Sequence, residues 1–190
     1  REKPETFDRL ENEFCRMLVE FGGLEVVEAG DGQVSFAGRL NGQDEKVTAE
    51  NMSQGTLYTL GLLVLAFEPR PPTMVCVEEI DRGIHPRLLR DVRDALYRLS
   101  HPESYGEKRE PVQIVTTTHS PYLLDLFKDH PEEVVIAQKD GREAHFERLV
   151  DRPDYQDLLS EGPLGDLWFS GILGGVPREK MPDDGREDGG

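Results

Sequence analysis

The pattern of apolar and polar residues along the chain predicts an α/β fold. Apolar residues recur at helical spacing in residues 6–21, 53–67 and 86–99. Two uncharged runs, 73–77 and 112–117, are rich in β-branched residues, and the first is expected to be buried on both faces as in parallel sheets. Because the helical segment 86–99 separates these runs, we predict a parallel pair of strands joined by a helical crossover.

Shorter strand-like runs predict β-hairpins at the edges of this sheet. Residues 24–28 and 34–40 lie on either side of a Gly-Asp-Gly turn, and residues 133–138 and 144–150 flank a second turn signal at 139–142. The expected fold is therefore α/β, with a mostly parallel sheet, flanking helices and edge hairpins.

Composition indicates one domain and argues against some functions. The 190 residues, 36% of them hydrophobic, are enough for one core. The formal net charge of -16 argues against a nucleic-acid-binding face on this chain, since such a face needs clustered Lys and Arg. Cys15 and Cys76 lack metal-ligand spacing and are expected to be buried, reduced thiols. No apolar run is long enough to span a membrane, so we predict a cytoplasmic protein without membrane contact.

Chemically reactive side chains follow both predicted central strands. The run 73–77 ends on Glu78 and Glu79, and Asp81 follows; the run 112–117 leads to His119. A lone Glu pair usually begins a polar loop, and a lone His after a strand is usually structural. Because parallel strands present their carboxyl ends at one edge, where open α/β sheets bind ligands, the combination favours a site.

A third signal lies at the start of the predicted helix 53–67. Ser53 is placed to cap the helix, and Gly55 allows close approach to its free backbone N–H groups. Such a helix start suits an anion such as phosphate. On these residues alone, an ordinary helix cap is the better explanation, because Ser caps are common.

The order of the three motifs resembles the C-terminal half of ABC-type ATPases, in particular the RecF/SMC-like AAA-family ATPases related to the OLD proteins. The resemblance covers residues 51–125. It implies a signature motif at 51–56, a Walker B strand at 74–79, a D-loop-like stretch at 80–86 and a switch histidine motif at 116–121.

The resemblance implies a role for each motif in ATP hydrolysis. Ser53, Gln54 and Gly55 would contact the γ-phosphate of ATP bound by the opposite subunit of a head-to-tail dimer. Two residues depart from the pattern of ABC transporters. Gln54 stands in the signature motif where transporters usually have Gly, and Ile80 follows the Walker B glutamate where they have Pro.

The remaining roles concern the strand ends. Glu78 would hold Mg²⁺, and Glu79 would polarise the attacking water. Asp81, and less directly His85, would lie in the loop that crosses the dimer interface. His119 would sense the γ-phosphate.

The sequence contains no G-x-x-x-x-G-K-[ST] motif, so it cannot bind the β-phosphate in the usual way. Because it also does not begin with Met, we expect residues 1–176 to be the C-terminal lobe of an ATPase, inactive alone, and 177–190 to be a disordered acidic tail. The expected cofactors are ATP and Mg²⁺. The expected partners are an N-terminal lobe that carries the P-loop, a second copy in a dimer closed by ATP, and DNA or an effector protein through parts outside this sequence.

Two alternatives remain open at the level of the sequence. The chain could be a non-hydrolysing interaction module that kept the fold. It could also be a metal-dependent nuclease, because Glu78, Glu79, Asp81 and His85 form a cluster of metal-ligand types. The nuclease hypothesis leaves the Ser53 and His119 motifs unexplained.

Overall fold

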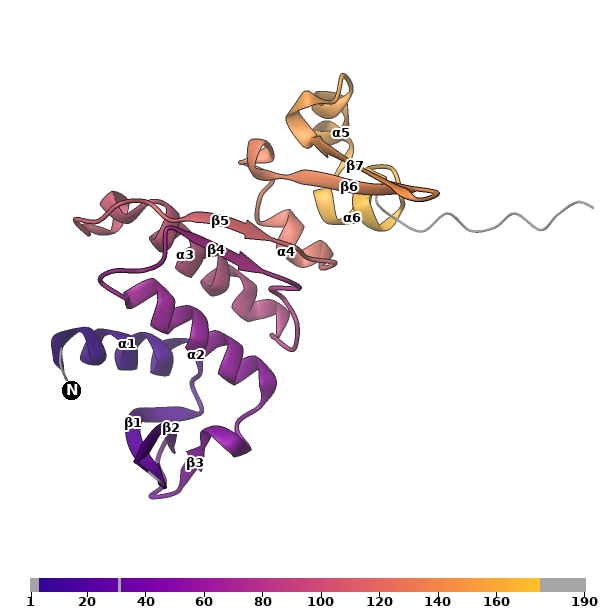
Figure 1. The fold of residues 1–190 in the computed structure, drawn as a ribbon. Coiled ribbons are helices and arrows are strands. Elements are labelled where there is room, and N and C mark those ends of the chain that lie inside the picture. Colours follow the sequence, from indigo (N-terminus) through magenta and orange to yellow (C-terminus); the bar gives the residue numbers. More distant parts are fainter. Residues whose placement is uncertain (1–3, 31, 175–190) are drawn as a thin grey trace, which may run out of the picture. The chain divides into compact units, whose positions relative to one another are not determined.

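The computed structural model describes residues 4–30 and 32–174 (Figure 1). The helices are α1 (Pro4–Met17), α2 (Gln54–Phe67), α3 (Leu89–Ser100), α4 (Pro121–Asp125), α5 (Tyr155–Glu161) and α6 (Leu164–Phe169). The strands are β1 (Phe21–Gly30), β2 (Gln33–Leu40), β3 (Lys46–Thr48), β4 (Met74–Val77), β5 (Gln113–Thr116), β6 (Val135–Asp140) and β7 (Glu143–Arg148). The chain divides into two compact units, Arg1–Leu123 and Leu124–Gly190, each described by itself. The division into a lobe of residues 1–176 and a tail stays a prediction, and the tail itself lies outside the described residues.

The described strands form three separate sheets. Strands β1, β2 and β3 are antiparallel, β4 and β5 form a parallel pair, and β6 and β7 form an antiparallel hairpin. The α/β class is confirmed, but the mostly parallel sheet with edge hairpins is wrong for these residues. The reason is local: each hairpin is closed by a short turn and packs its apolar side chains on neighbouring helices, so it is not an edge of the β4–β5 sheet.

Helices α2 and α3 cover one face of the parallel pair (Figure 1). The shared core contains one buried residue from α2, one from β4, two from α3 and one next to β5: Ala66, Val75, Ala95, Leu99 and Val112. The opposite face is open, because the side chains of Met74 and Val115 are 49% and 51% exposed and Cys76 is also exposed. The expected burial of this strand on both faces, and of Cys76, is therefore wrong.

The antiparallel sheet packs on α1 and α2 around a second core. Phe14 is fully buried, its ring centroid lies 5.1 Å from that of Phe21, and Leu24 and Leu63 are also buried. The helical period predicted for residues 6–21 explains why α1 presents an apolar face to this sheet.

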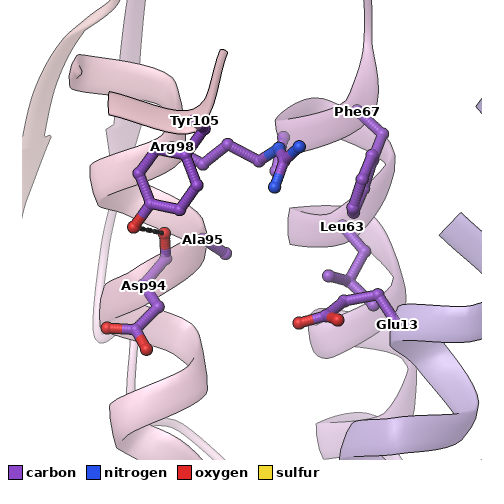
Figure 2. Close-up of a pocket in the computed structure, with 8 residues that line it drawn as sticks. Glu13, Leu63, Phe67, Asp94, Ala95, Arg98 and Tyr105 are labelled. Carbon is purple, nitrogen blue, oxygen red and sulfur yellow. Dashed lines mark hydrogen bonds between the residues drawn. The ribbon is translucent and has the colours of Figure 1, made fainter. Parts of the chain in front are cut away.

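A small cavity of about 50 Å³ lies between α1, α2 and α3 (Figure 2). It is lined by Glu13, Leu63, Ala66, Phe67, Asp94, Ala95, Arg98 and Tyr105. The volume is far below the roughly 300 Å³ at which ligand pockets begin. The cavity is therefore a packing gap beside the second core and not a candidate site.

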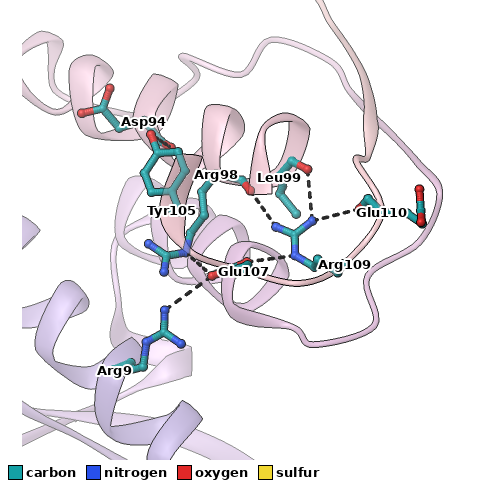
Figure 3. Close-up of polar contacts among 8 residues, drawn as sticks. All are labelled: Arg9, Asp94, Arg98, Leu99, Tyr105, Glu107, Arg109 and Glu110. Atoms are coloured by element: carbon teal, nitrogen blue, oxygen red, sulfur yellow. Dashed lines mark hydrogen bonds and ion pairs between the residues drawn. The ribbon is translucent and has the colours of Figure 1, made fainter. Parts of the chain in front are cut away.

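The loop after α3 is fixed by a carboxylate that pairs with several arginines (Figure 3). Glu107 accepts from Arg98 at 2.7 Å, from Arg109 at 2.9 Å and from Arg9 at 3.4 Å. Arg109 also donates to the carbonyls of Arg98 and Leu99, in the last turn of α3. The network anchors residues 101–111 to α3 and to α1.

The unit that begins at Leu124 packs the β6–β7 hairpin on α5 and α6. Its core includes Leu149, Leu164 and Leu173, each fully buried, together with Ile136 of β6. Within the described residues, no helix has both the length and the apolar character needed to cross a membrane.

Candidate functional site

The parallel pairing of β4 and β5 brings the two predicted strand-end motifs to one edge. Val77 lies opposite Thr116 in the register, and the Thr117 amide donates to the Val77 carbonyl at 3.0 Å. The segments after the two strands therefore leave the sheet side by side, at the edge where such sheets bind ligands.

Glu79 starts the turn after β4 in a conformation that residues with a side chain rarely adopt. Its φ is +47°, in the left-handed region, and strained backbone of this kind clusters at functional sites. The Glu79 amide donates to Thr117 Oγ1 at 3.0 Å, and the Ile80 amide donates to the Thr117 carbonyl at 3.1 Å. The Glu79 carboxylate is about half exposed and lies 3.5 Å from Arg82 Nη1.

Thr118 connects Asp81 to the loop that contains His119. Its Oγ1 donates to Asp81 Oδ1 at 2.5 Å and accepts from the Ser120 amide at 3.0 Å. Ser120 in turn accepts from the Leu123 amide at 3.3 Å, as expected of a residue that caps the start of α4. The exposed His119 thus lies between two residues whose positions are fixed by hydrogen bonds.

Two buried isoleucines anchor the turn after β4. Ile80 is 1% exposed and Ile84 is 7% exposed, so the turn is attached to the core at both ends. Between them, the Ile84 amide donates to the Asp81 carbonyl at 3.1 Å and the Arg82 amide donates to the Glu79 carbonyl at 2.8 Å. With the isoleucines buried, Glu78 and Glu79 are exposed, and Asp81 is half-buried against Thr118.

The start of α2 is built as predicted. Ser53 Oγ accepts from the Thr56 amide at 3.1 Å and lies 2.8 Å from Thr56 Oγ1, so Ser53 caps the helix. Gly55 is buried because the chain passes directly against it: a Cβ at Gly55 would lie 2.1 Å from the Gly83 carbonyl oxygen. This contact joins the start of α2 to the turn after β4.

Glu78 and His85 occupy different surroundings in the same turn. Glu78 is exposed beside Glu79, and adjacent carboxylates supply the hard oxygen ligands that suit Mg²⁺. His85 Nδ1 instead accepts from the Arg87 amide at 3.2 Å, at the start of the short 3-10 turn Pro86–Leu88. His85 therefore has a capping contact of its own, and its place in an interface loop stays a prediction.

All the predicted site residues lie in the unit Arg1–Leu123. The structure joins the Glu79–Asp81 turn to the His119 loop by hydrogen bonds, and it joins the Gly55 helix start to the same turn through Gly83. Sequence reasoning missed Thr117 and Thr118 as contributors. The available signal was the run of three threonines before His119, whose hydroxyl groups a buried strand would not need.

Other candidate sites lie in the second unit. His130, Glu132 and Glu133 are exposed, and their ligand atoms lie within 4.8 Å of one another. A cavity of about 430 Å³ is lined by Glu147, Arg152, Pro153 and Asp154. The Arg152 guanidinium there is already held by Asp154 at 3.0 Å and by the Leu173 carbonyl, and it lowers the pKa of Asp154. None of these residues belongs to the predicted motifs.

Comparisons with known proteins bear on the same part of the chain. Residues 3–125 match the family model described as "AAA domain, putative AbiEii toxin, Type IV TA system". No curated protein matches the chain.

Two solved structures with a similar fold come from studies of SMC proteins. One comes from work on the ATP-driven dimerization and DNA-stimulated activation of SMC ATPases; it is 15% identical with a TM-score of 0.52, and the match covers 82% of this chain and 91% of that one. Another is an Smc head bound to the C-terminal winged-helix domain of ScpA; it is 13% identical with a TM-score of 0.51, and the match covers 74% of this chain but 42% of that one. These likenesses show the fold.

Proposed function

This chain belongs to the AAA-domain family described for the AbiEii-type toxin, and from that membership we propose that it supplies one half of a composite site for Mg²⁺-dependent ATP hydrolysis. The other half, with the P-loop, lies on a segment outside this sequence. The chain contributes the Ser53–Gly55 helix start, the Glu78–Asp81 turn and the His119 loop, and ATP closes two such assemblies head to tail.

The observation that carries the proposal is the convergence of three motifs that are distant in sequence. Gly55 touches Gly83, and the threonines before His119 bond to Glu79 and Asp81. Phosphoryl transfer to water needs an oriented nucleophile, a metal and donors to the phosphate oxygens, with little covalent work by the protein. The Glu78–Asp81 turn and the His119 loop lie together and would serve one ATP. The Ser53–Gly55 helix start, joined to the same turn through Gly83, would contact the ATP of the opposite subunit.

Each residue type fits its proposed task. The exposed carboxylate of Glu78 would hold Mg²⁺, which would neutralise charge on the phosphate oxygens. Glu79 accepts a hydrogen bond from the attacking water and orients it. His119 donates a hydrogen bond to a γ-phosphate oxygen. Ser53 and Gln54 lie at the start of α2, where backbone N–H groups and the helix dipole favour an anion.

The open face of the β4–β5 sheet supports a missing lobe. Met74, Cys76 and Val115 project from strands of four residues each, whereas parallel strands are normally covered on both faces. A lobe that carries the P-loop and extends the sheet would cover these side chains.

Further partners and the location follow from the same proposal. The SMC ATPases described with the first structure dimerize in an ATP-driven way and are activated by DNA, which supports an ATP-closed dimer here and DNA or an effector protein as a partner outside this acidic chain. The two free cysteines agree with a reducing compartment such as the cytosol.

The test is ATP turnover by this chain together with the polypeptide that carries the P-loop. We expect Mg²⁺-dependent hydrolysis only with both pieces. Glu79→Gln should abolish turnover and trap an ATP-bound dimer that elutes as a larger species, while His119→Ala should reduce turnover more than ATP affinity. Glu28→Gln, at an exposed position of β1, is the matched control and should behave as the wild type.

Several outcomes would contradict the proposal. Unchanged turnover in Glu79→Gln would remove Glu79 from the reaction. Binding of the two pieces without any hydrolysis would favour the non-hydrolysing interaction module. Metal-dependent DNA cleavage without ATP would favour the nuclease.

A further inference from the structure

Three consecutive threonines at the end of β5 bond to the segment after β4 in a regular order. Thr116 Oγ1 donates to the Val77 carbonyl at 2.9 Å, and Thr117 Oγ1 accepts from the Glu79 amide at 3.0 Å. Thr118 Oγ1 donates to Asp81 Oδ1 at 2.5 Å. Each step of one residue along the threonine run moves the partner by two residues. We call residues 116–118 the threonine ladder.

The first threonine of the ladder bonds within the paired strands, whereas the other two bond to the turn that follows β4. Thr116 lies within β5, and its bond adds to a pairing that the backbone of Val77 and Thr117 already makes. Beyond Val77 the backbone pairing continues through the Thr117 carbonyl and the Ile80 amide, and the hydroxyl groups of Thr117 and Thr118 add further links to the turn.

Thr117 acts where the turn is strained. Glu79 has φ at +47°, and backbone in this region persists when surrounding contacts fix it. The Thr117 hydroxyl supplies such a contact, because it accepts the hydrogen bond of the Glu79 amide itself. Without an acceptor at this point, the Glu79 amide loses its protein partner and the turn gains freedom.

Thr118 acts on the other side of the turn. Its hydroxyl holds the Asp81 carboxylate and at the same time accepts from the Ser120 amide. It therefore bonds to residues on both sides of the edge, directly beside His119. If Asp81 moves, Thr118 Oγ1 has to move with it or lose the hydrogen bond. Because the same oxygen accepts from the Ser120 amide, the backbone next to His119 would then shift as well.

We propose that Thr117 and Thr118 are positioning residues: Thr117 fixes the backbone of Glu79, and Thr118 couples Asp81 to the His119 loop. The inference rests on the proposed function for its effect on turnover, while the ladder itself is a property of this chain. The hydroxyl groups act through Glu79, Asp81 and His119, so they influence the rate of hydrolysis and leave nucleotide binding largely unchanged.

Turnover by the complete ATPase tests the effect on the reaction. Thr117→Val keeps the shape of the side chain and removes the acceptor, so we expect kcat to fall about tenfold, the factor that matches the net worth of one hydrogen bond, with KM for ATP unchanged. Thr117→Ser should restore kcat, and Thr118→Val should lower it. Thr116→Val is the matched control, because its hydroxyl contacts Val77 alone among the residues of the facing segment.

Amide hydrogen exchange in the full chain, followed by NMR, tests the ladder without ATP. We expect the Glu79 amide to exchange roughly three- to tenfold faster in Thr117→Val than in the wild type, as for loss of one hydrogen bond. The Ile80 amide, which donates to the backbone carbonyl of Thr117, should change less. Thr116→Val should leave the Glu79 amide unchanged, and Thr117→Ser should protect it.

The two measurements separate failure of the inference from failure of the proposed function. If the complete wild-type protein does not hydrolyse ATP, the proposed function fails, and the exchange data still decide whether Thr117 fixes Glu79. If the Glu79 amide exchanges equally fast in the wild type and in Thr117→Val, the ladder is refuted. If kcat falls no further in Thr117→Val than in Thr116→Val, or if KM rises in proportion, the positioning role is refuted.

Discussion

The contact between Gly55 and Gly83 gives a stability prediction that can be worked out from the structure. A Cβ at Gly55 would lie 2.1 Å from the Gly83 carbonyl oxygen and 2.9 Å from its carbonyl carbon. Both are backbone atoms and cannot rotate away. Gly83 has φ at +70° and is followed by the buried Ile84, so the turn has little freedom to retreat.

We therefore expect Gly55→Ala to destabilise the protein. Forcing a methyl group into a packed contact costs about 1–3 kcal/mol, and the gain in helix propensity from replacing Gly offsets at most about 1 kcal/mol. With the full offset the net loss is up to roughly 2 kcal/mol, which corresponds to a fall in the urea midpoint of up to about 1 M for a slope of about 2 kcal/mol/M.

The same helix supplies a matched control. Gly61 is exposed in α2, and a Cβ there would meet no atom within 4 Å. Gly61→Ala should stabilise the protein by about 0.5–1 kcal/mol, because only the entropic cost of Gly changes. Urea unfolding followed by circular dichroism measures both variants. If Gly55→Ala is as stable as Gly61→Ala, the start of α2 does not touch the turn after β4, and the convergence argument fails.

Two further predictions concern the loop after α3 and the open sheet face. Glu107→Gln should lower the free energy of unfolding by about 1–3 kcal/mol, since the side chains of Glu107 and Arg109 are 16% and 9% exposed and the variant removes the negative charge that pairs with the guanidinium; an unchanged urea midpoint would contradict this. In the chain alone, exposed Cys76 should react with iodoacetamide faster than Cys15, because burial and the nearby Glu11 raise the pKa of the Cys15 thiol. Addition of the P-loop polypeptide should slow the labelling of Cys76, and equal rates with and without it would contradict the proposed cover.

Local signals in the sequence were enough to predict most elements of the fold. The helix expected at residues 53–67 is α2, which starts at Gln54 because Ser53 caps it, and ends at Phe67 shortly before Pro69. Both hairpins were predicted from turn residues between short strand-like runs. Caps and tight turns depend on neighbours in sequence, so the sequence alone contains the information.

Burial of the parallel strands could not be predicted in the same way. An uncharged run such as Met74 to Val77 indicates a strand that is buried on both faces of its sheet. The sequence does not show which segments pack on those faces. In this chain α2 and α3 cover the face of Val75, and the face of Met74 and Cys76 is open. The apolar character of the run thus fits the proposed complete ATPase better than the chain alone.

The contacts that build the candidate site were also beyond the reach of sequence patterns. Both the approach of Gly55 to Gly83 and the bond between Thr117 and Glu79 join residues far apart in the chain, and they depend on how two loops lie in space. The motif order indicated which residues matter. It did not indicate that a threonine hydroxyl fixes the backbone of Glu79.

The position of the open face relative to the catalytic edge suggests why the two halves of the proposed ATPase should work as one. Strands β4 and β5 have four residues each, and a sheet of two short strands depends on further strands or on packing for its stability. The residues proposed for hydrolysis are attached to the carboxyl ends of these same strands. A lobe that covers Met74, Cys76 and Val115 would therefore stabilise the strands and, through the threonine ladder, the turn that holds Glu79. On this reasoning, binding of the P-loop lobe and ordering of the catalytic residues are one event, so the chain alone is not expected to hydrolyse ATP even with nucleotide in excess.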